Sequence, residues 1–432
     1  MQNVAATAAE QRAGDGRQLA AYGAGVGAES APSFSATPVF LSAKDHAALA
    51  RSVAVIEHVI ALPDFQGIAI ARAPGIAQHR FGPRGVFMGY DFHMTAEGPR
   101  LIEINTNAGG ALLNAAAARA HRSCCEPLDR FFGAPADLDQ LNHSFVDMFV
   151  AEWQAQRGDA PLRSILIVDD KPHEQYLASE FQICRELFLR HGMTAVVADP
   201  AELQWRGGAL WHPALPEDMP VDLVYSRLTD FYLSEPGHAA LRSAYVSGAT
   251  VVTPHPRAHA VHADKRNLIT LSDDALLAAW DVPQEDRALL RAVVPATQLV
   301  TPENADTLWA RRRQLFFKPA DGYGAKAAYR GDKLTRRVWH EIIGGSFVAQ
   351  ALVPPSERLV EVDGTSTRLK LDVRAYVYDG QIQLLAARTY AGQTTNFRTA
   401  GGGFSPVVVL PPLYSTPNQE FHDEALSRSC AC

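Results

Sequence analysis

The sequence predicts a mixed α/β fold with several units, on three observations. Between residues 164 and 254 short apolar strands alternate with helices, which is typical of a parallel sheet covered by helices. Residues 85–105 and 371–389 alternate apolar and polar side chains around turn signals, as antiparallel hairpins do. Residues 43–62 place apolar side chains at helical spacing and end before Pro63.

The composition is that of an ordinary globular protein. Apolar residues make up 47% of the 432 positions and charged residues 20%, enough for two to three domains with a large core. The net charge of −7, without a basic stripe, argues against nucleic-acid binding, and no apolar run reaches the ~18 residues of a membrane span. The five cysteines lack zinc-ligand spacing and no secretion signal is visible, so we expect a reduced, cytoplasmic protein.

The α/β unit is expected between residues 161 and 260, after a boundary at 158–161. Its strands are predicted at 164–170, 194–199, 221–228 and 249–254, with a helix over 173–192. The other expected segments are a flexible N-terminus (1–36), N-terminal helices with the first hairpin (37–157), a lysine and glycine-loop segment (261–345), a C-terminal sheet (346–410) and a tail (411–432).

The first hairpin carries the strongest chemical signal. Glu103 and Asn105 project from the same face of a strand, and a hairpin centred near Glu97 sets Asp91 directly opposite Glu103. Two facing carboxylates repel each other, and a divalent cation between them removes that cost. Oxygen ligands of this kind suit Mg²⁺ shared with substrate phosphates. The alternative interpretation is a surface hairpin with solvated acids.

Two lysines could serve a phosphate group. Lys318 ends the apolar strand 315–319, and the following loop contains Gly322 and Gly324. Glycines let backbone amides turn toward a phosphate, while the lysine supplies a positive charge, although the Walker order is missing. Lys265 lies at the start of a helix-like segment. An ordinary loop and a surface lysine are the alternatives.

Three candidate arginines lie in the C-terminal part of the chain. The hairpin 371–389 carries Arg374 and Arg388, and a strict two-residue turn at Asp379-Gly380 puts them on opposite faces. A β-bulge is needed if both line one site. Further along, residues 394–403 add Asn396, Arg398 and three glycines. Upstream, the strand in 346–357 runs into a Pro-Pro break where backbone groups could meet an adenine edge.

Together these motifs resemble the ATP-grasp superfamily, above all the glutathione synthetase-like carboxylate–amine ligases. The resemblance implies ATP and Mg²⁺, two ions in the family, as cofactors. ATP would be bound by Lys265, Lys318, Gly322, Gly324, the hinge Gln350, Ala351 and Leu352, and Asn396. Arg374, Arg388 and Arg398 would be catalytic and hold the transferred phosphoryl group, and Asp91, Glu103 and Asn105 would bind metal. Ala325 departs from the family pattern, which often has Ser in the glycine loop.

The order of the motifs differs from that of an ordinary member. There the metal motif follows the lysines, whereas here it comes first. We therefore expect a circularly permuted ATP-grasp fold, in which the N-terminal hairpin completes the sheet of residues 346–410. The Rossmann-like α/β unit at 161–260 would be the inserted, pre-ATP-grasp substrate domain.

The resemblance implies a ligase that joins a small, amino-acid- or peptide-like acid to an amine through an acyl phosphate. At the predicted carboxyl edge of the α/β unit, Arg227 could clamp the acid and Asp230 an amino group, with Glu180 as a weaker candidate. A salt bridge between Arg227 and Asp230 is the alternative. A phosphotransferase and a non-catalytic ATP-binding regulator remain alternative functions. We expect small-molecule acid and amine partners, no nucleic acid, no membrane, and leave a homodimer open.

Overall fold

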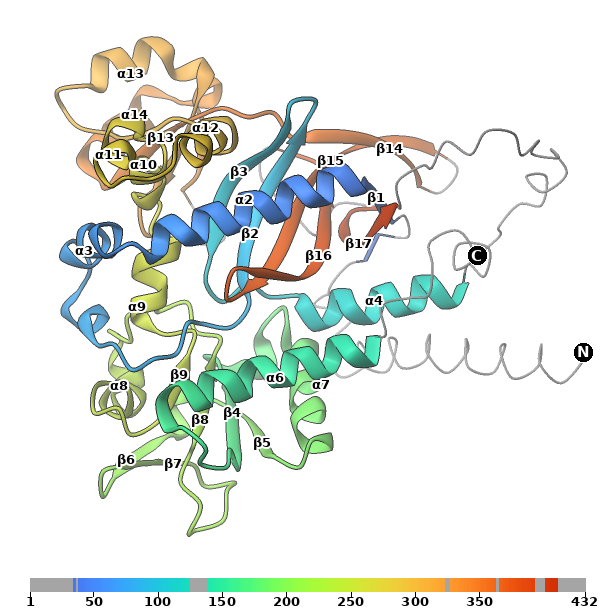
Figure 1. Cartoon of the computed structure of the whole chain (residues 1–432), viewed down its shortest axis with the longest axis vertical. Coiled ribbons are helices and arrows are strands. Elements are labelled where there is room, and N and C mark those ends of the chain that lie inside the picture. Colours follow the sequence, from blue (N-terminus) through green and yellow to red (C-terminus); the bar gives the residue numbers. More distant parts are fainter. Residues whose placement is uncertain are drawn as a thin grey trace, which may run out of the picture.

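A computed structural model describes residues 34–35, 38–124, 138–322, 327–362, 365–392 and 401–410 of the chain. Its central sheet consists of β1 (Val39–Ser42), β2 (Met88–Thr95), β3 (Gly98–Asn105), β14 (Ser356–Val362), β15 (Thr365–Tyr378), β16 (Gln381–Tyr390) and β17 (Gly403–Leu410). The strand order is β1-β17-β16-β15-β2-β3, with β14 also paired to β15. The light-blue strands β2 and β3 thus continue the sheet formed by the orange and red strands β14, β15, β16 and β17 (Figure 1). The prediction that strand 99–106 shares one sheet with residues 370–410 is confirmed.

The β2–β3 hairpin has the predicted register at the predicted metal residues. Asp91 lies opposite Glu103, and the strands turn between Thr95 and Gly98. The register shifts by one residue after Asp91, because Phe92 pairs with Leu101. This bulge reconciles a turn centred before Glu97 with the facing carboxylates.

The β15–β16 hairpin contains the bulge that the two arginines require. Asp379 and Gly380 have φ angles of 49° and 72°, which a tight two-residue hairpin turn demands. The register shifts between Tyr376 and Val377. As a result Arg374 and Arg388 lie on the same face of the sheet instead of opposite faces.

A second, antiparallel sheet belongs to the lysine segment. It consists of β10 (Thr297–Leu299), β11 (Leu315–Pro319), β12 (Tyr329–Arg330) and β13 (Phe347–Ala351), in the order β10-β13-β11-β12. Around it lie α10 (Asn267–Leu271), α11 (Asp274–Ala279), α12 (Gln284–Val293), α13 (Ala305–Arg311) and α14 (Arg336–Gly344), at one end of the molecule in Figure 1. Phe317 and Trp339 pack edge to face in its core, with ring centroids 5.3 Å apart. Strand β11 matches the predicted strand 315–319.

The third sheet is parallel, as predicted. Its order is β5 (Thr194–Ala198), β4 (Ser164–Val168), β8 (Leu223–Ser226) and β9 (Val251–Thr253), and it carries the ribbon β6 (Gln204–Arg206)–β7 (Ala209–Trp211). Helices α6 (Leu138–Arg157), α7 (Ala178–Arg190) and α8 (Ala239–Val246) surround it at the opposite end of Figure 1. Every residue of β4 is buried, which explains its uninterrupted apolar sequence. Helix α7 begins later than predicted because Pro172–Glu174 form a separate 3-10 turn.

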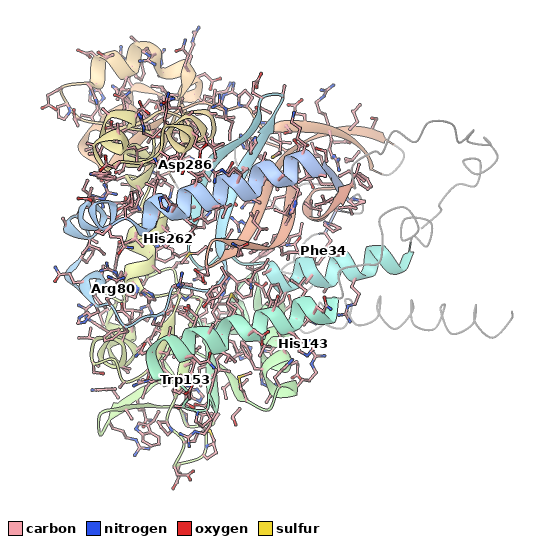
Figure 2. The ribbon with its side chains drawn as sticks, in the orientation of Figure 1. Phe34, Arg80, His143, Trp153, His262 and Asp286 are labelled. Atoms are coloured by element: carbon pink, nitrogen blue, oxygen red, sulfur yellow. The ribbon has the colours of Figure 1, made fainter. Side chains whose placement is uncertain are left out.

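Helices cover both faces of the central sheet. Helix α2 (Ala43–Ala61) begins at Ser42, whose Oγ accepts a hydrogen bond from the Asp45 amide, and it buries Leu49, Val53 and Ile56 against one face. Helix α4 (Ala111–Cys124) packs on the other face, against β16 and β17. Asp286 of α12, labelled in Figure 2, pairs with Arg51 of α2 at 2.5 Å and ties the lysine segment to this helix.

Within the described residues no single helix is long and apolar enough to cross a bilayer. Helix α2 and the following α3 (Pro63–Ala71) meet that test only as a bent pair, on length and composition.

Candidate active site

A buried ion network marks the centre of the main sheet. Nε and Nη2 of Arg374 donate to the two oxygens of Asp91 at 2.7 and 2.8 Å, and Nη2 of Arg388 lies 2.8 Å from Oδ2 of Asp91. Nε of Arg388 donates to Asp372 at 2.6 Å. Burial alone would raise the pKa of Asp91, but the two guanidinium charges outweigh it and lower that pKa. The carboxylate therefore stays ionised.

Glu103 and Asn105 join this network from the edge strand β3. Asn105 Nδ2 donates to Asp91 Oδ2 at 3.0 Å and to Glu103 Oε1 at 3.3 Å. Burial alone would raise the pKa of Glu103, but the positive charges of Lys265 and Lys318 outweigh burial. The pKa of Glu103 is therefore below its usual value. The three predicted metal residues thus lie together, with two lysines beside them.

The two predicted lysines also reach this point, Lys318 from β11 of the second sheet and Lys265 from the segment just before α10. Lys318 Nζ donates to the Ile102 carbonyl at 2.7 Å and to Gln350 Oε1 at 2.9 Å. Lys265 Nζ donates to the Gly322 carbonyl at 2.6 Å and lies 4.0 Å from Glu103 Oε2. Burial lowers the pKa of Lys318 to about 8, with the charge of Glu103 opposing that shift. The segment that contains the two lysines and the β2–β3 hairpin therefore face each other.

The residues present fit a divalent cation through two of the three predicted ligands. Glu103 and Asn105 are only partly buried and offer hard oxygens, whereas Asp91 is 1% exposed and both its oxygens already accept hydrogen bonds from arginines. Asp91 is thus placed to hold the arginines, and Glu103 with Asn105 are placed to take Mg²⁺.

The predicted hinge has fewer free donors than expected. The backbone amides of Ala351 and Leu352 donate to the carbonyls of Ala296 and Gln314, both at 2.8 Å. In contrast, Nε2 of the buried Gln350 has no hydrogen-bond partner among the described residues. A nucleotide base at this turn would therefore meet the Gln350 side chain or the hinge carbonyls.

Arg227 lies at the carboxyl end of β8, next to the loop that follows β3. Its Nη1 donates to Tyr225 Oη at 3.0 Å and to the Asn107 carbonyl at 3.3 Å. Its Nε is buried without a partner among the described residues. Arg227 thus connects the parallel sheet to the residues directly after Asn105.

The other two substrate candidates have partners within the protein. Asp230 accepts hydrogen bonds from Ser234 and the Glu235 amide and contacts His238, each at 2.8 Å. These groups, and not the alternative salt bridge to Arg227, are the partners of its carboxylate. Glu180 accepts from the amides of Gly110 and Leu112 at the start of α4, at 2.8 and 3.0 Å. Three predicted ATP or phosphoryl contacts, Gly324, Asn396 and Arg398, lie outside the described residues, as does Ala325.

Two acids of the site were missing from the sequence prediction. Asp372 pairs with Arg388, and the alternation of the Asp-Val-Arg run could have revealed it, because residues 372 and 374 share a strand face. Asp169 follows β4 at the edge that holds Arg227, where the strand-end rule could have found it. Burial raises the pKa of Asp169 to about 7, against the opposing charge of Arg227.

No family model matches the sequence, and neither does any curated protein. Among solved structures, a glutathione synthetase-like effector from Globodera pallida in its apo form covers 87% of this chain and 90% of its own, with 10% identity and a TM-score of 0.51. A putative gamma-glutamylcysteine synthetase from Methylobacillus flagellatus covers 88% of this chain and 91% of its own, with 12% identity and a TM-score of 0.47. D-alanyl-alanine synthetase A from Vibrio cholerae covers 54% and 88%, with 13% identity and a TM-score of 0.31.

The first likeness extends over nearly the whole length of both chains. Together with the mixed central sheet and the antiparallel second sheet it defines the class of fold: a mixed α/β protein of the ATP-grasp type. At 10% identity the likeness concerns the fold alone.

Proposed function

We propose that the protein is an ATP-dependent ligase that forms an amide between a small carboxylic acid and an amine. The observation that carries the proposal is the convergence of two lysines, Glu103, Asn105 and two fixed arginines from three distant chain segments. A charge arrangement of this kind suits phosphoryl transfer, in which the protein mainly positions reactants and offsets negative charge.

In this proposal each group has a defined task. Lys265 and Lys318 contact the ATP phosphates, while Arg374 and Arg388, fixed by Asp91 and Asp372, hold the phosphoryl group during transfer. Mg²⁺, held by Glu103 and Asn105, would offset phosphate charge. A substrate carboxylate oxygen takes the γ-phosphoryl group and ADP leaves. The amine nitrogen then attacks the acyl carbon, inorganic phosphate leaves, and the amine proton passes to solvent.

Arg227 is the proposed clamp for the acid, because it ends a strand beside the metal loop and its Nε has no partner among the described residues. An amino-acid-like or peptide-like acid fits an arginine at that place. We further propose a cytoplasmic location and two Mg²⁺ ions. We also propose a circular permutation with residues 161–260 as the inserted substrate domain, because the β2–β3 hairpin precedes the lysines in the chain yet shares the sheet of β15.

Product analysis tests the reaction class. The chain is incubated with ATP, Mg²⁺ and pairs of amino acids, small peptides and polyamines, and the ADP, phosphate and organic products are measured. We expect ADP, phosphate and an amide to appear together. A stable phosphorylated product would favour the phosphotransferase, and nucleotide binding without turnover in every pair would favour the regulator.

A further inference from the structure

His259 lies where three segments of the chain meet. Its Nδ1 is 2.8 Å from Oγ1 of Thr106, the residue directly after Asn105. Its ring stacks on Phe231 of the loop after β8, with centroids 3.8 Å apart and planes 8° apart, and Tyr232 packs edge-on at 5.4 Å. The ring is 5% exposed. The side chain is thus held between the end of the metal strand and the loop that carries Arg227.

His259 also lines a small cavity. The cavity has a volume of about 10 Å³, and Thr106, Asn107, Ser226 and His259 are among the residues that line it. Nε2 of His259 and Oδ1 of Asn107 are buried and have no hydrogen-bond partner among the described residues. Buried polar atoms are normally hydrogen-bonded, and a space of this size suits one water molecule. One water could bridge the two atoms.

The backbone around His259 also leads to the phosphate lysine. A single π-helical turn, His259–Ala263, follows the short helix α9 (Pro256–Ala258) and ends one residue before Asp264-Lys265. Such turns often occur at functional sites. Burial lowers the pKa of His259 to about 3, so the ring is neutral at physiological pH, with one nitrogen donating and the other accepting.

We propose that His259 is a positioning residue that fixes the turn 105–107 from both ring nitrogens, directly through Thr106 and through one buried water to Asn107. The inference rests on the proposed function, in which Glu103 and Asn105 hold the cation. When the turn shifts, Asn105 loses its alignment beside Glu103 and Asp91, and cation affinity falls. His259 itself touches neither cation nor substrate.

Mn²⁺ binding tests this role without measuring turnover. The whole chain is titrated with Mn²⁺ in the presence of a non-hydrolysable ATP analogue, and free Mn²⁺ is followed by electron paramagnetic resonance. Thr106→Val keeps the shape and removes the hydroxyl, His259→Gln reaches only the Nε2 position, and His259→Asn reaches only the Nδ1 position. We expect the first two changes to raise the Mn²⁺ dissociation constant roughly tenfold. His259→Asn keeps the direct bond to Thr106 and loses only the water link, so it should raise the constant by a smaller factor, about threefold.

His255→Asn is the matched control. His255 is also buried and lines the same cavity. Within the described part of the chain its hydrogen bonds go to the Pro83 carbonyl and the Ala258 amide, not to the turn 105–107. Its replacement should leave Mn²⁺ binding unchanged. A fall equal to that of His259→Gln would reveal general loosening and overturn the proposal.

Three further outcomes are decisive. Unchanged Mn²⁺ affinity in folded Thr106→Val, checked by near-ultraviolet circular dichroism, overturns the role of His259, and this variant decides the matter if the His259 variants do not fold. Mn²⁺ binding that depends on Glu103 but not on Thr106 removes this inference alone. Binding that survives Glu103→Gln overturns the proposed function and this inference with it.

Discussion

Arg374 forms a bidentate ion pair with Asp91 across the paired strands β15 and β2. Its Nε and Nη2 atoms donate to the two carboxylate oxygens at 2.7 and 2.8 Å. Both side chains are buried, at 10% and 2% side-chain exposure. The contact joins residues from opposite ends of the chain. It also determines the direction in which the guanidinium group of Arg374 points, and the loss of Asp91 would leave that buried charge without its carboxylate partner.

Asp91→Asn should therefore destabilise the fold as well as reduce turnover. Removing one partner of a buried ion pair typically costs about 3–5 kcal/mol. Urea unfolding measures the loss. The control is Asp379→Asn, because Asp379 forms an exposed pair with Arg84 that contributes at most about 1 kcal/mol. Equal losses in the two variants would contradict the ion network described for Asp91.

Glu103→Gln should abolish Mg²⁺-dependent ATP turnover while the fold is retained, because the change removes a charge and keeps the shape. The assay is ADP release at increasing Mg²⁺. Glu97→Gln, in the exposed turn of the same hairpin, should behave like the unmodified chain. Near-normal turnover in Glu103→Gln would rule out its assignment as a metal ligand.

Nucleotide affinity should fall as the pH rises above about 8. The Lys318 ammonium has a pKa lowered to about 8 by burial, so in the free protein it loses its proton above that pH and with it the attraction to phosphate. Lys318→Arg should remove this pH dependence, since arginine stays protonated, and Lys318→Ala should weaken binding at every pH. Titration of ATP at pH 7 and pH 9 is the measurement; a flat profile in the unmodified chain would speak against a phosphate role for Lys318.

Arg227→Ala should raise the KM for the acid substrate much more than the KM for ATP. Arg227 directly follows β8 of the parallel sheet, whereas Lys318, a proposed phosphate contact, lies on β11 of the second sheet. Arg242→Ala, on α8 of the same unit, is the control because Arg242 donates to the Tyr232 and Leu233 carbonyls of a nearby loop. An effect on ATP alone would place Arg227 in the nucleotide site.

Acid should weaken the fold through buried histidines. Burial lowers the pKa of His255 to about 4, so the unfolded chain takes up a proton below about pH 6.5 while the folded chain stays neutral until about pH 4. The stabilisation is complete above pH 6.5 and is lost as the pH falls toward 4. Between pH 7.5 and 5.5 the unmodified chain should lose about 1 kcal/mol more unfolding free energy than His255→Asn. Identical losses in urea unfolding would refute this.

The sequence predicted the elements whose pattern is local. Strand β11 and the turn at Asp379-Gly380 depend on apolar periodicity and turn residues, which are visible in the local sequence. The parallel sheet follows from short apolar runs. By contrast, β1 forms only because β17 lies beside it, and the short strands β10 and β12 also require their partners. Such pairings have no local signature.

The site shows the same division. The opposition of Asp91 and Glu103 follows from hairpin spacing, and the need for a bulge between Arg374 and Arg388 follows from strand parity. The engagement of both Asp91 oxygens by arginines could not be predicted, because it depends on the packing of β2 against β15. The position of His259 beside Thr106 likewise results from the assembly of three units.

The place of β2 in the sheet has a consequence for biosynthesis. The ribosome completes β2 and β3 long before it reaches residues 365–378, the strand that pairs with the other edge of β2 in the described structure. During that interval the edge exposes unpaired backbone groups next to Tyr90 and Phe92, which is a template for wrong association. A nascent chain interrupted before β15 would thus carry an aggregation-prone edge and a half-built acidic centre, and only the late C-terminal strands protect the earliest-made part of the site.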